Sequence, residues 1–504
     1  MEYQISEKAK KTTLGLAIVG LVMMVIGFFS QKEYVFADKI DEHTVNIEYW
    51  GSAEQSQIDE LKSSLISKME NKGYSLEIHD ANHAHGDDAH ADSHGEHHES
   101  PTFLWNVHVK PSTESAGHGG HHEDAAQEVV EMCESGEVGF FDSGIRRFWS
   151  NLLINGLFFF GISLGALFYL ALHHATESGW GVVLLRVFEG VSMVLPLGIV
   201  ILIVVFITGA LGLNHIYSWM DPEVVATDNL VWRKSAYFNQ VFFWIRVVAY
   251  FGIFLYFMKW FRNMSTKQDK QDKEEAVVTH FTMYRRAALF LVFFAVFSST
   301  MSWDFIMSID IHWYSTLFGW YTFSGIWLTG MIMVIMITAY LKKGGFLPLV
   351  KMSHVHDVAK WIFALSFLWS YLWFSQFMLI WYSNMGEETI YYWERIMEYK
   401  YLYFTMFGVN FILPMVFFIA RDVKRSWPYI ITISTVVFIG HWFDTFMMVM
   451  PGTLHDEWSF GLLEVGMFFM FLGVFVFAVL KSISKAPLVQ VNHPFLDESK
   501  HHEF

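Results

Sequence analysis

Cysteine is almost absent from this chain of 504 residues, in which Cys133 is the sole example. A c-type haem requires a C-x-x-C-H attachment sequence, and the common iron–sulfur clusters require four thiolate ligands. An intramolecular disulfide requires two cysteines. The sequence therefore excludes a c-type haem, a four-cysteine iron–sulfur cluster and an internal disulfide in this chain.

Charged residues are sparse in ten apolar segments that are rich in Leu, Phe, Met and Ile. Most of these segments are close to the roughly 20 residues that cross a bilayer as a helix. Backbone groups in hydrocarbon must be hydrogen-bonded within the segment, and long helices meet this demand. The sequence therefore predicts an all-α polytopic membrane protein with ten transmembrane helices. The predicted segments are residues 13–29, 148–172, 186–213, 237–261, 287–301, 317–341, 359–383, 401–420, 428–450 and 460–480.

Lysine and arginine are concentrated in every second connection between these segments. Positive residues near membrane ends stay on the cytoplasmic side, so we expect the basic connections and both termini to be cytoplasmic. The opposing connections are mainly acidic, and residues 303–315 contain no Lys or Arg. We expect these connections on the outer side. The basic stretches are residues 8–11, 259–286, 342–351 and 421–425.

The longest connection, residues 31–147, is acidic and is expected on the outer side. Residues 44–49 and 103–109 alternate between polar and apolar side chains, which predicts strands. Between His79 and His122 the chain places eleven histidines among Ala, Gly, Asp, Glu and Ser. Because few of these residues can build a core, we expect a flexible loop without a defined metal site. Occasional binding of Zn²⁺, Cu²⁺ or Ni²⁺ and a pH-responsive tether are the alternatives.

The first apolar segment has two interpretations, because a lysine-rich start followed by a short apolar run also resembles a secretion signal. The run ends in Phe28 and Phe29, and residues 33–37 lack a pair of small residues suited to cleavage. We therefore expect an uncleaved membrane anchor.

Histidines near the apolar segments do not form a pair suited to a b-type haem, which would need two intramembrane histidines at matching depth on facing helices. His173 and His174 lie at the cytoplasmic end of the second segment, and His215 lies just beyond the outer end of the third. His441 lies in the outer half of the ninth. We therefore expect no redox cofactor and no metal bound by this chain itself.

Polar residues in the outer halves of the segments are functional candidates, since they are costly in a membrane. His441 and Asp444 are three residues apart and share a helical face, and Glu464 is expected at similar depth. Such groups relay protons or hydrogen-bond a quinone, and the competing interpretation is that they join helices by hydrogen bonds. The proton-pathway candidates on this side are His441, Asp444, Glu464, Ser370 and Gln376, and the quinone-binding candidates are Trp303, Asp304 and His312.

A second group of polar residues is expected nearer the cytoplasmic side. An arginine as deep in the membrane as Arg246 should find an acid or a carbonyl partner. For this group we favour structural ion pairing over proton conduction, while keeping its members as proton-pathway candidates. They are His173, His174, Glu177, Glu189 and Arg246, with Arg186 beside them. Pro196 and Pro414 are expected to kink their helices.

Three stretches carry a family resemblance: SWDFIMSIDIHWYSTLFGWY from Ser302, FSQFMLIWYSNMGEET from Phe374 and GHWFDTFMMVMPG from Gly440. They resemble the second, larger membrane subunit of bacterial alternative complex III, a quinol:cytochrome c oxidoreductase. That subunit is in the membrane-anchor family of polysulfide and nitrite reductases. The resemblance covers residues 145–485 and does not include the histidine-rich insertion.

The resemblance implies two four-helix bundles, formed by helices 2–5 and 6–9, with helices 1 and 10 at the periphery. A short internal echo fits this division, because WDFIM at residues 303–307 and WFDTFMM at 442–448 end the equivalent helix of each bundle. The implied regions are an anchor (1–30), the outer insertion (31–147), a first bundle (148–301), a second bundle (302–450) and a last helix with a cytoplasmic tail (451–504).

The resemblance also implies a multi-subunit complex in the bacterial inner membrane. Haem and iron–sulfur clusters would reside in partner subunits, namely a multihaem c-type cytochrome and an iron–sulfur protein. A homologous quinol-binding membrane subunit, small subunits and membrane lipids complete the expected partners, and nucleic acid is not among them. A terminal oxidase as a further partner, and menaquinone or its quinol as a ligand of this chain, stay open.

Three functions from different classes follow. The first is a membrane subunit without a redox centre that scaffolds a quinol-oxidising complex and contributes a proton half-channel. The second is a quinol-binding catalytic subunit, with a cavity near Asp304, His312 or His441 that opens to lipid. The third is a secondary transporter, which predicts broken helices at matching positions of two halves. Pro196 and Pro414 do not occupy equivalent helices, which argues against the transporter.

Overall fold

The computed structural model describes residues 3–29, 36–41, 43–49, 55–71, 74–80, 103–111, 126–127, 129–130, 142–455 and 458–503. The chain divides into two compact units. One comprises Met1–Gly27 with Arg146–Phe504, and the other comprises Phe28–Ile145.

The first unit confirms the predicted class, since the described residues include ten helices that are long and apolar enough to cross a membrane. Several extend beyond the apolar segments. The fifth, for example, begins at Lys273 rather than near residue 287, because Asp272 caps it by accepting a 2.9 Å hydrogen bond from the Glu275 amide. The spans are α1 (Glu7–Phe29), α4 (Asp142–Ala175), α5 (Leu185–Ser192) with α6 (Leu195–Ala210), α9 (Gln240–Gln268), α10 (Lys273–Phe305), α11 (Phe318–Lys343), α12 (Met352–Ser383), α14 (Lys400–Phe407) with α15 (Leu413–Phe418), α16 (Trp427–Val449) and α18 (Leu462–Ile483).

Two of the spans are irregular, and each irregularity lies next to a proline, as the sequence predicts. The third span breaks into α5 and α6 at residues 193–194, and Pro196 lies in the first turn of α6. The eighth span contains a π-helical turn, Gly408–Ile412, between α14 and α15, and Pro414 follows it. Proline lacks the amide hydrogen that a continuing helix needs, so both interruptions have a local cause.

The inner helices of this unit form two neighbouring sets. In the first set α9 packs against α6 and α10, and α4 approaches α6 at Gly198. In the second set α11 packs against α12 and α16, and α15 packs against both α12 and α16. The sets meet where α10 contacts α11 and where α4 crosses α11, so closely that a Cβ on Gly165 would overlap the Ile326 carbonyl oxygen. We call them the first and second helix sets below.

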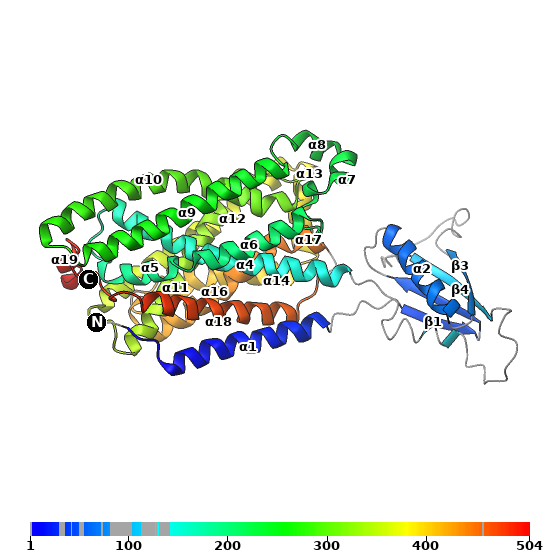
Figure 1. The fold of residues 1–504 in the computed structure, drawn as a ribbon, viewed down its shortest axis with the longest axis horizontal. Helices are drawn as coiled ribbons and strands as arrows, with labels where there is room; N and C mark the ends of the chain where they lie inside the picture. The colour runs from blue at the N-terminus through cyan, green and yellow to red at the C-terminus, as the bar shows by residue number, and fades with distance from the viewer. Residues whose placement is uncertain are drawn as a thin grey trace. The chain divides into compact units, whose positions relative to one another are not determined.

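The first and last spans, α1 and α18, run side by side along the membrane unit (Figure 1). Their contact is made by small residues. A Cβ on Gly20 or Gly466 would overlap the backbone of the opposite helix, and Gly473 lies against Ala17 in the same way. Without side chains between them, the two backbones approach closely, which is the usual basis of helix association in a bilayer.

Both ends of the chain lie at the same end of the membrane unit. Tyr3 packs on Phe346 with ring centroids 5.0 Å apart, and His502 Nε2 lies 2.6 Å from Asp357 Oδ2. The lysine- and arginine-rich connections lie at this end, which we call the basic end, and α19 (Leu496–His501) packs there. The opposite, acidic end carries α7 (Pro222–Thr227), α8 (Asn229–Lys234), α13 (Gly386–Met397) and α17 (Pro451–Leu454).

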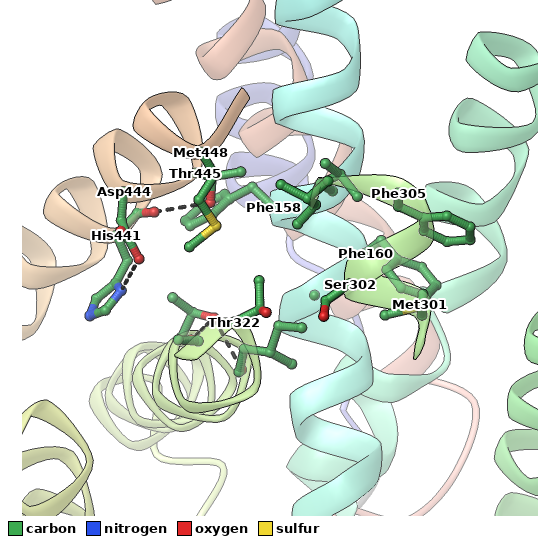
Figure 2. Close-up of a pocket in the computed structure, with 16 residues that line it drawn as sticks. Phe158, Phe160, Met301, Ser302, Phe305, Thr322, His441, Asp444, Thr445 and Met448 are labelled. Carbon is green, nitrogen blue, oxygen red and sulfur yellow. Dashed lines mark hydrogen bonds and ion pairs between the residues drawn. The ribbon is translucent and has the colours of Figure 1, made fainter. Parts of the chain in front are cut away.

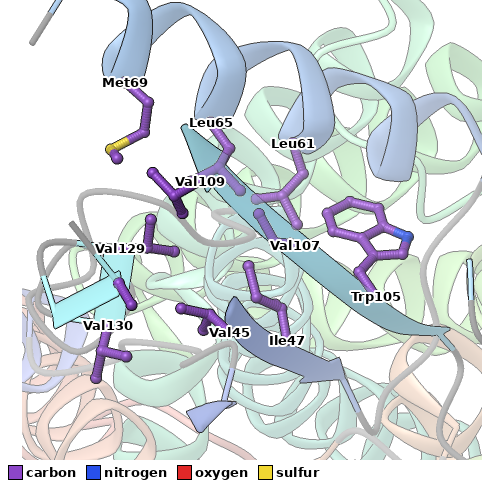
Figure 3. Packing of buried hydrophobic residues seen from close by; sticks show 11 residues of the cluster. Val45, Ile47, Leu61, Leu65, Met69, Trp105, Val107, Val109, Val129 and Val130 are labelled. Carbon is purple, nitrogen blue, oxygen red and sulfur yellow. The ribbon is translucent and has the colours of Figure 1, made fainter. Parts of the chain in front are cut away.

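The second unit is a small α/β fold. Its antiparallel sheet has the order β1 (Phe36–Asp41), β2 (Thr44–Tyr49), β4 (Phe103–Pro111) and β3 (Tyr74–Asp80). The helix α2 (Gln55–Asn71) places Leu61, Leu65 and Met69 against the apolar face of the sheet (Figure 3). The predicted strands β2 and β4 are confirmed, whereas β1, β3 and α2 were not foreseen. Most of the histidine-rich stretch lies outside the described residues.

Candidate functional site

Buried carboxylates identify the chemically unusual places in the membrane unit. Among the described residues, four acidic side chains are at most 2% exposed, and all four lie in spans: Glu189, Asp304, Asp444 and Glu464. A carboxylate in hydrocarbon is costly unless it is paired and hydrogen-bonded. The partners of these four acids therefore separate structural roles from chemical ones.

Glu464 is held by an arginine near the acidic end. Arg147 donates through Nε to Glu464 Oε1 at 2.7 Å and through Nη2 to Oε2 at 2.6 Å. The Asn151 amide and the Gly461 backbone N–H add bonds of 2.9 and 2.8 Å. These four bonds occupy both oxygens, and none of them involves His441 or Asp444. Depth alone placed Glu464 with those two residues, and Arg147, just before the predicted second span, was not considered.

Asp304 is held in the same manner. Arg246 binds it with both arms of the guanidinium, Nε to Oδ2 at 2.7 Å and Nη2 to Oδ1 at 2.9 Å, and Tyr250 donates to Oδ2 at 2.8 Å. The Arg246 guanidinium also donates to the Tyr237 carbonyl at 3.0 Å and lies over the Tyr237 ring. The prediction that Arg246 finds an acid or a carbonyl partner is confirmed.

Glu189 is the centre of a buried network near the basic end. Its Oε2 accepts from Arg186 at 3.0 Å and from Arg262 at 2.7 Å, and its Oε1 accepts from Ser265 and Gln490 at 2.6 and 2.8 Å. Arg186 also donates to the Asp269 carboxylate. The ion pairing expected in this region is therefore present for Glu189 and Arg186. The network also attaches the C-terminal segment, through Gln490, to α5 and α9.

Asp444 differs from the other three acids. Its carboxylate accepts hydrogen bonds from the Tyr321 hydroxyl and from Trp369 Nε1, the latter at 2.9 Å, and Oδ2 lies 3.6 Å from His441 Nδ1. No Lys or Arg within the described part of the chain forms an ion pair with it. Its immediate partners are a phenol, an indole and an imidazole rather than a fixed cation.

A cavity of about 50 Å³ opens beside His441 and Asp444, which project from α16 across from Ser302 and Phe305 of α10 (Figure 2). It lies between the two helix sets and we call it the central cavity. A buried water needs about 10–15 Å³ of such space, so the cavity has room for about four waters. Neither ring nitrogen of His441 has a hydrogen-bond partner among the described residues. Water in the central cavity would offer this ring a hydrogen-bond partner.

A second cavity of about 20 Å³ lies towards the acidic end, on the other side of Tyr321. We call it the tyrosine cavity, because Tyr391 and Tyr403 also line it together with Gln376 and Arg395. Gln376 Oε1 and the Tyr403 hydroxyl have no hydrogen-bond partner among the described residues. Burial raises the pKa of Tyr391, so this phenol stays protonated at neutral pH. Polar groups thus continue from α13 to Asp444.

Three buried serines near this site differ in whether their hydroxyl groups already have a hydrogen-bond partner. Ser370, a proton-pathway candidate, donates to the Phe367 carbonyl at 2.8 Å and is satisfied within its own helix. Ser366 and Ser434 are buried, and their hydroxyls have no partner among the described residues. Ser434 precedes His441 by seven residues and so lies two turns nearer the basic end on the same face of α16.

The three quinone-binding candidates are not brought together by any contact. Asp304 is engaged by Arg246, whereas His312 is exposed and lies 2.8 Å from Asp228. The Leu230 amide, which donates to Asp228, holds the pKa of that carboxyl below its usual range. The indole Nε1 of Trp303 has no hydrogen-bond partner among the described residues.

The histidines near the basic end do converge, with members that the sequence analysis did not include. His174 meets His280 of α10 and His493 of the C-terminal segment, and one ring nitrogen of each lies within 4.8 Å of the others. Glu177 Oε1 lies 3.8 Å from His280 Nε2. Burial lowers the pKa of His493 to about 2. His280 was missed because it precedes the apolar segment, although it lies within the capped helix.

Neither a protein-family model nor a curated protein sequence matches this chain. Support for a function therefore comes from the geometry of the buried acids and from the three stretches that carry the resemblance.

Proposed function

We propose that this chain is a membrane subunit of a bacterial quinol:cytochrome c oxidoreductase of the alternative complex III type. In this proposal it has no redox centre of its own, scaffolds the complex and contributes a proton half-channel in the second helix set. The three stretches that resemble the larger membrane subunit support the setting. Two of them lie in or beside the second helix set, and the first runs from the end of α10 in the first set to the start of α11. The contacts of Asp444 support the proton function.

The observation that carries the proton function is that no arginine among the described residues forms an ion pair with Asp444. A proton that reaches Glu189, Asp304 or Glu464 must break an ion pair before it binds, whereas Asp444 accepts one without that cost. The neighbouring Tyr321, Trp369 and His441 are dipoles or groups that exchange protons. Asp444 is therefore the buried acid best suited to alternate between its charged and neutral forms.

The two cavities give this acid a route. Protons entering at the acidic end would pass the tyrosine cavity and the Tyr321 hydroxyl to Asp444, and then His441 and the water of the central cavity. Gln376 lies on this route, whereas Glu464 and Arg246 lie off it, in completed ion pairs. The buried hydroxyl of Ser434 extends the polar face of α16 towards the basic end.

Orientation follows from the positive-inside rule, with the basic end on the cytoplasmic side of the bacterial inner membrane. The acidic end would then meet the multihaem cytochrome and the iron–sulfur subunit on the periplasmic side. Membrane lipids, a homologous quinol-binding subunit and small subunits would contact the remaining faces.

The two competing functions have less support from the geometry. A quinol-binding subunit would need a cavity near Asp304, His312 or His441. The central cavity beside His441 measures about 50 Å³, far below the roughly 300–1,000 Å³ of small-molecule pockets. Asp304 is paired with Arg246, and His312 is paired with Asp228 at the surface. A transporter would need matching helix breaks. The interruption at Pro196 is in the second helix of the first set, whereas the one before Pro414 is in the third helix of the second set.

Purification through a tag on this chain in mild detergent tests the proposed setting. Haem spectra, subunit identification and analysis of extracted quinone on the same sample are expected to show c-type haem and an iron–sulfur subunit. A colourless polypeptide without partners would contradict the proposal and favour the transporter. Reconstitution of the purified complex into vesicles then allows protons translocated per electron to be measured with quinol as donor and cytochrome c as acceptor.

A further inference from the structure

Three histidines from distant parts of the sequence meet at the basic end of the membrane unit. His174 lies in the last turn of α4, His280 lies in the first turns of α10, and His493 lies between α18 and α19. Their exposed fractions are 1%, 3% and 5%. One ring nitrogen of each lies within 4.8 Å of the other two. They are separate from Asp444 and from both of its cavities.

Four ring nitrogens of these histidines lack hydrogen-bond partners among the described residues. His174 Nδ1, both nitrogens of His280 and His493 Nε2 have no hydrogen bond within the described residues. Each buried polar atom left in this state destabilises the fold by about 1–3 kcal/mol. Packing alone does not explain three such residues side by side. A ligand that binds imidazole nitrogen would satisfy one nitrogen of each ring at once.

The donor set indicates the class of ligand. Three neutral imidazoles without a thiolate suit a divalent transition metal such as Zn²⁺, with a fourth position left for water. At metal–nitrogen distances of about 2.0–2.1 Å, tetrahedral ligands lie about 3.4 Å apart, so the rings must close by about 1.4 Å at most. His174 lies at a helix end and His493 lies between two helices, so this closure would not require a shift in the middle of a span.

Glu177 supplies a negative charge beside the cluster. Its Oε1 lies 3.8 Å from His280 Nε2, and its side chain is 42% exposed, whereas the three histidines are buried. Its backbone has φ +49°, a left-handed conformation that costs a non-glycine residue about 1–2 kcal/mol. The neighbouring acids Glu189 and Asp269 are already balanced by Arg186 and Arg262.

Coordination of a metal by His493 would break one existing hydrogen bond. The Phe495 amide donates to His493 Nδ1 at 3.2 Å, whereas a histidine that ligates through Nε2 carries its proton on Nδ1. The bond lost is long and joins residues only two apart. Coordination therefore links the position of the C-terminal segment to the bound ion.

From these observations we propose that His174, His280 and His493 form a binding site for a divalent transition metal, with Glu177 as its nearby carboxylate. The ion fastens the C-terminal segment to α4 and α10 at the basic end. The site is independent of the proposed respiratory function, because no group of the proton route belongs to it.

The test uses the full-length chain and Zn²⁺ as the probe. Nine histidines of the insertion would bind zinc unspecifically, so the background variant carries asparagine in their place while His79 and His108 are kept, and a tag without histidine is used. Zinc per chain is measured by mass spectrometry, and the dissociation constant is measured by competition with a chromophoric chelator. We expect one tightly held zinc per chain. The replaced residues are His83, His85, His90, His94, His97, His98, His118, His121 and His122.

Variants in this background assign the ion to the cluster. Loss of a residue that only contacts a metal ligand weakens metal binding by about 10–100-fold, and we expect this effect for Glu177→Gln. His280→Asn and His493→Asn each remove a ligand, so each should weaken zinc binding by more than that. His501→Asn is the matched control, since His501 is an exposed histidine of the same C-terminal segment whose Nδ1 contacts only the Asp497 carbonyl. It should leave zinc binding unchanged.

X-ray absorption on the background protein keeps the proposal testable where a ligand variant does not fold. Zinc should show imidazole nitrogens at about 2.0–2.1 Å. The proposal is overturned if the background protein holds no stoichiometric zinc, if the absorption spectrum lacks imidazole scattering, or if folded His280→Asn and His493→Asn variants retain zinc with unchanged affinity.

Discussion

The last helix of each helix set carries a buried aspartate in a similar sequence, and the two aspartates have opposite surroundings. Asp304, in the WDFIM stretch of α10, receives two bonds from the Arg246 guanidinium. Asp444, in the WFDTFMM stretch of α16, accepts hydrogen bonds from the Tyr321 hydroxyl and the Trp369 indole and lies near His441. Similar local sequence therefore gives a fixed ion pair in one helix set and an acid without a fixed cation in the other.

The difference arises from neighbouring helices. Arg246 and Tyr250 come from α9, whereas the corresponding span of the second set, α14 with α15, offers no cation to Asp444 and contains the buried amide of Asn410. The partners of Asp444 come instead from α11 and α12. A residue type at one position is thus not enough to assign its role, because the adjacent helices decide whether its charge is neutralised.

The largest effect, a loss of stability, is expected from removing the arginine of the Arg246–Asp304 pair. Arg246→Met leaves Asp304 buried without its cation, and a broken buried ion pair destabilises a protein by about 3–5 kcal/mol. Thermal unfolding in detergent and yield of the assembled complex measure this. The double variant Arg246→Met with Asp304→Leu should regain most of the loss. A stable single variant would show that Asp304 does not depend on the pair.

Asp444→Asn should act on function and spare the fold. The amide keeps the size of the side chain, its oxygen can accept from Trp369 Nε1, and its NH2 group can donate to the Tyr321 oxygen. Because it carries no exchangeable acidic proton, translocated protons per electron should be lost while the complex stays assembled. The measurement is proton uptake and release by reconstituted vesicles. Glu464→Gln is the matched control, expected to weaken the Arg147 pair and to keep translocation. Normal translocation by assembled Asp444→Asn would eliminate the half-channel.

Tyr321→Phe should have an intermediate effect. It removes the hydroxyl that lies between the tyrosine cavity and Asp444. Loss of one hydrogen bond to a buried acid costs about 1–3 kcal/mol of free energy. Translocation should slow without vanishing, because Trp369 still holds Asp444 in place. The rate of proton release at fixed electron flux measures this. An unchanged rate would move the route away from Tyr321.

Gly325→Ala should produce the smallest effect. The added methyl would lie 3.6 Å from His441 Nδ1 and 3.8 Å from Asp444 Oδ2, which are ordinary contacts, so the fold should keep its stability or gain up to about 1 kcal/mol in the helix. The methyl occupies part of the central cavity that waters would fill. A modest decrease in translocation rate with unchanged thermal stability is expected, and a loss of assembly would contradict it.

The ten spans, the strands β2 and β4 and the shared helical face of His441 and Asp444 follow from the amino-acid sequence alone. These features depend on the length, hydropathy and periodicity of short segments, which can be read along the chain. The helix interruptions near Pro196 and Pro414 belong to the same class, since a proline acts on its own turn.

The pairing of the buried groups depends instead on how the helices pack. Arg147 reaches Glu464 across 317 residues, and Tyr321 reaches Asp444 across 123. His493 meets His174 and His280 although nothing in its local sequence marks it. An ion pair or a ligand cluster depends on which helices become neighbours and on how they are rotated, and side chains on facing helices carry no common pattern in the sequence.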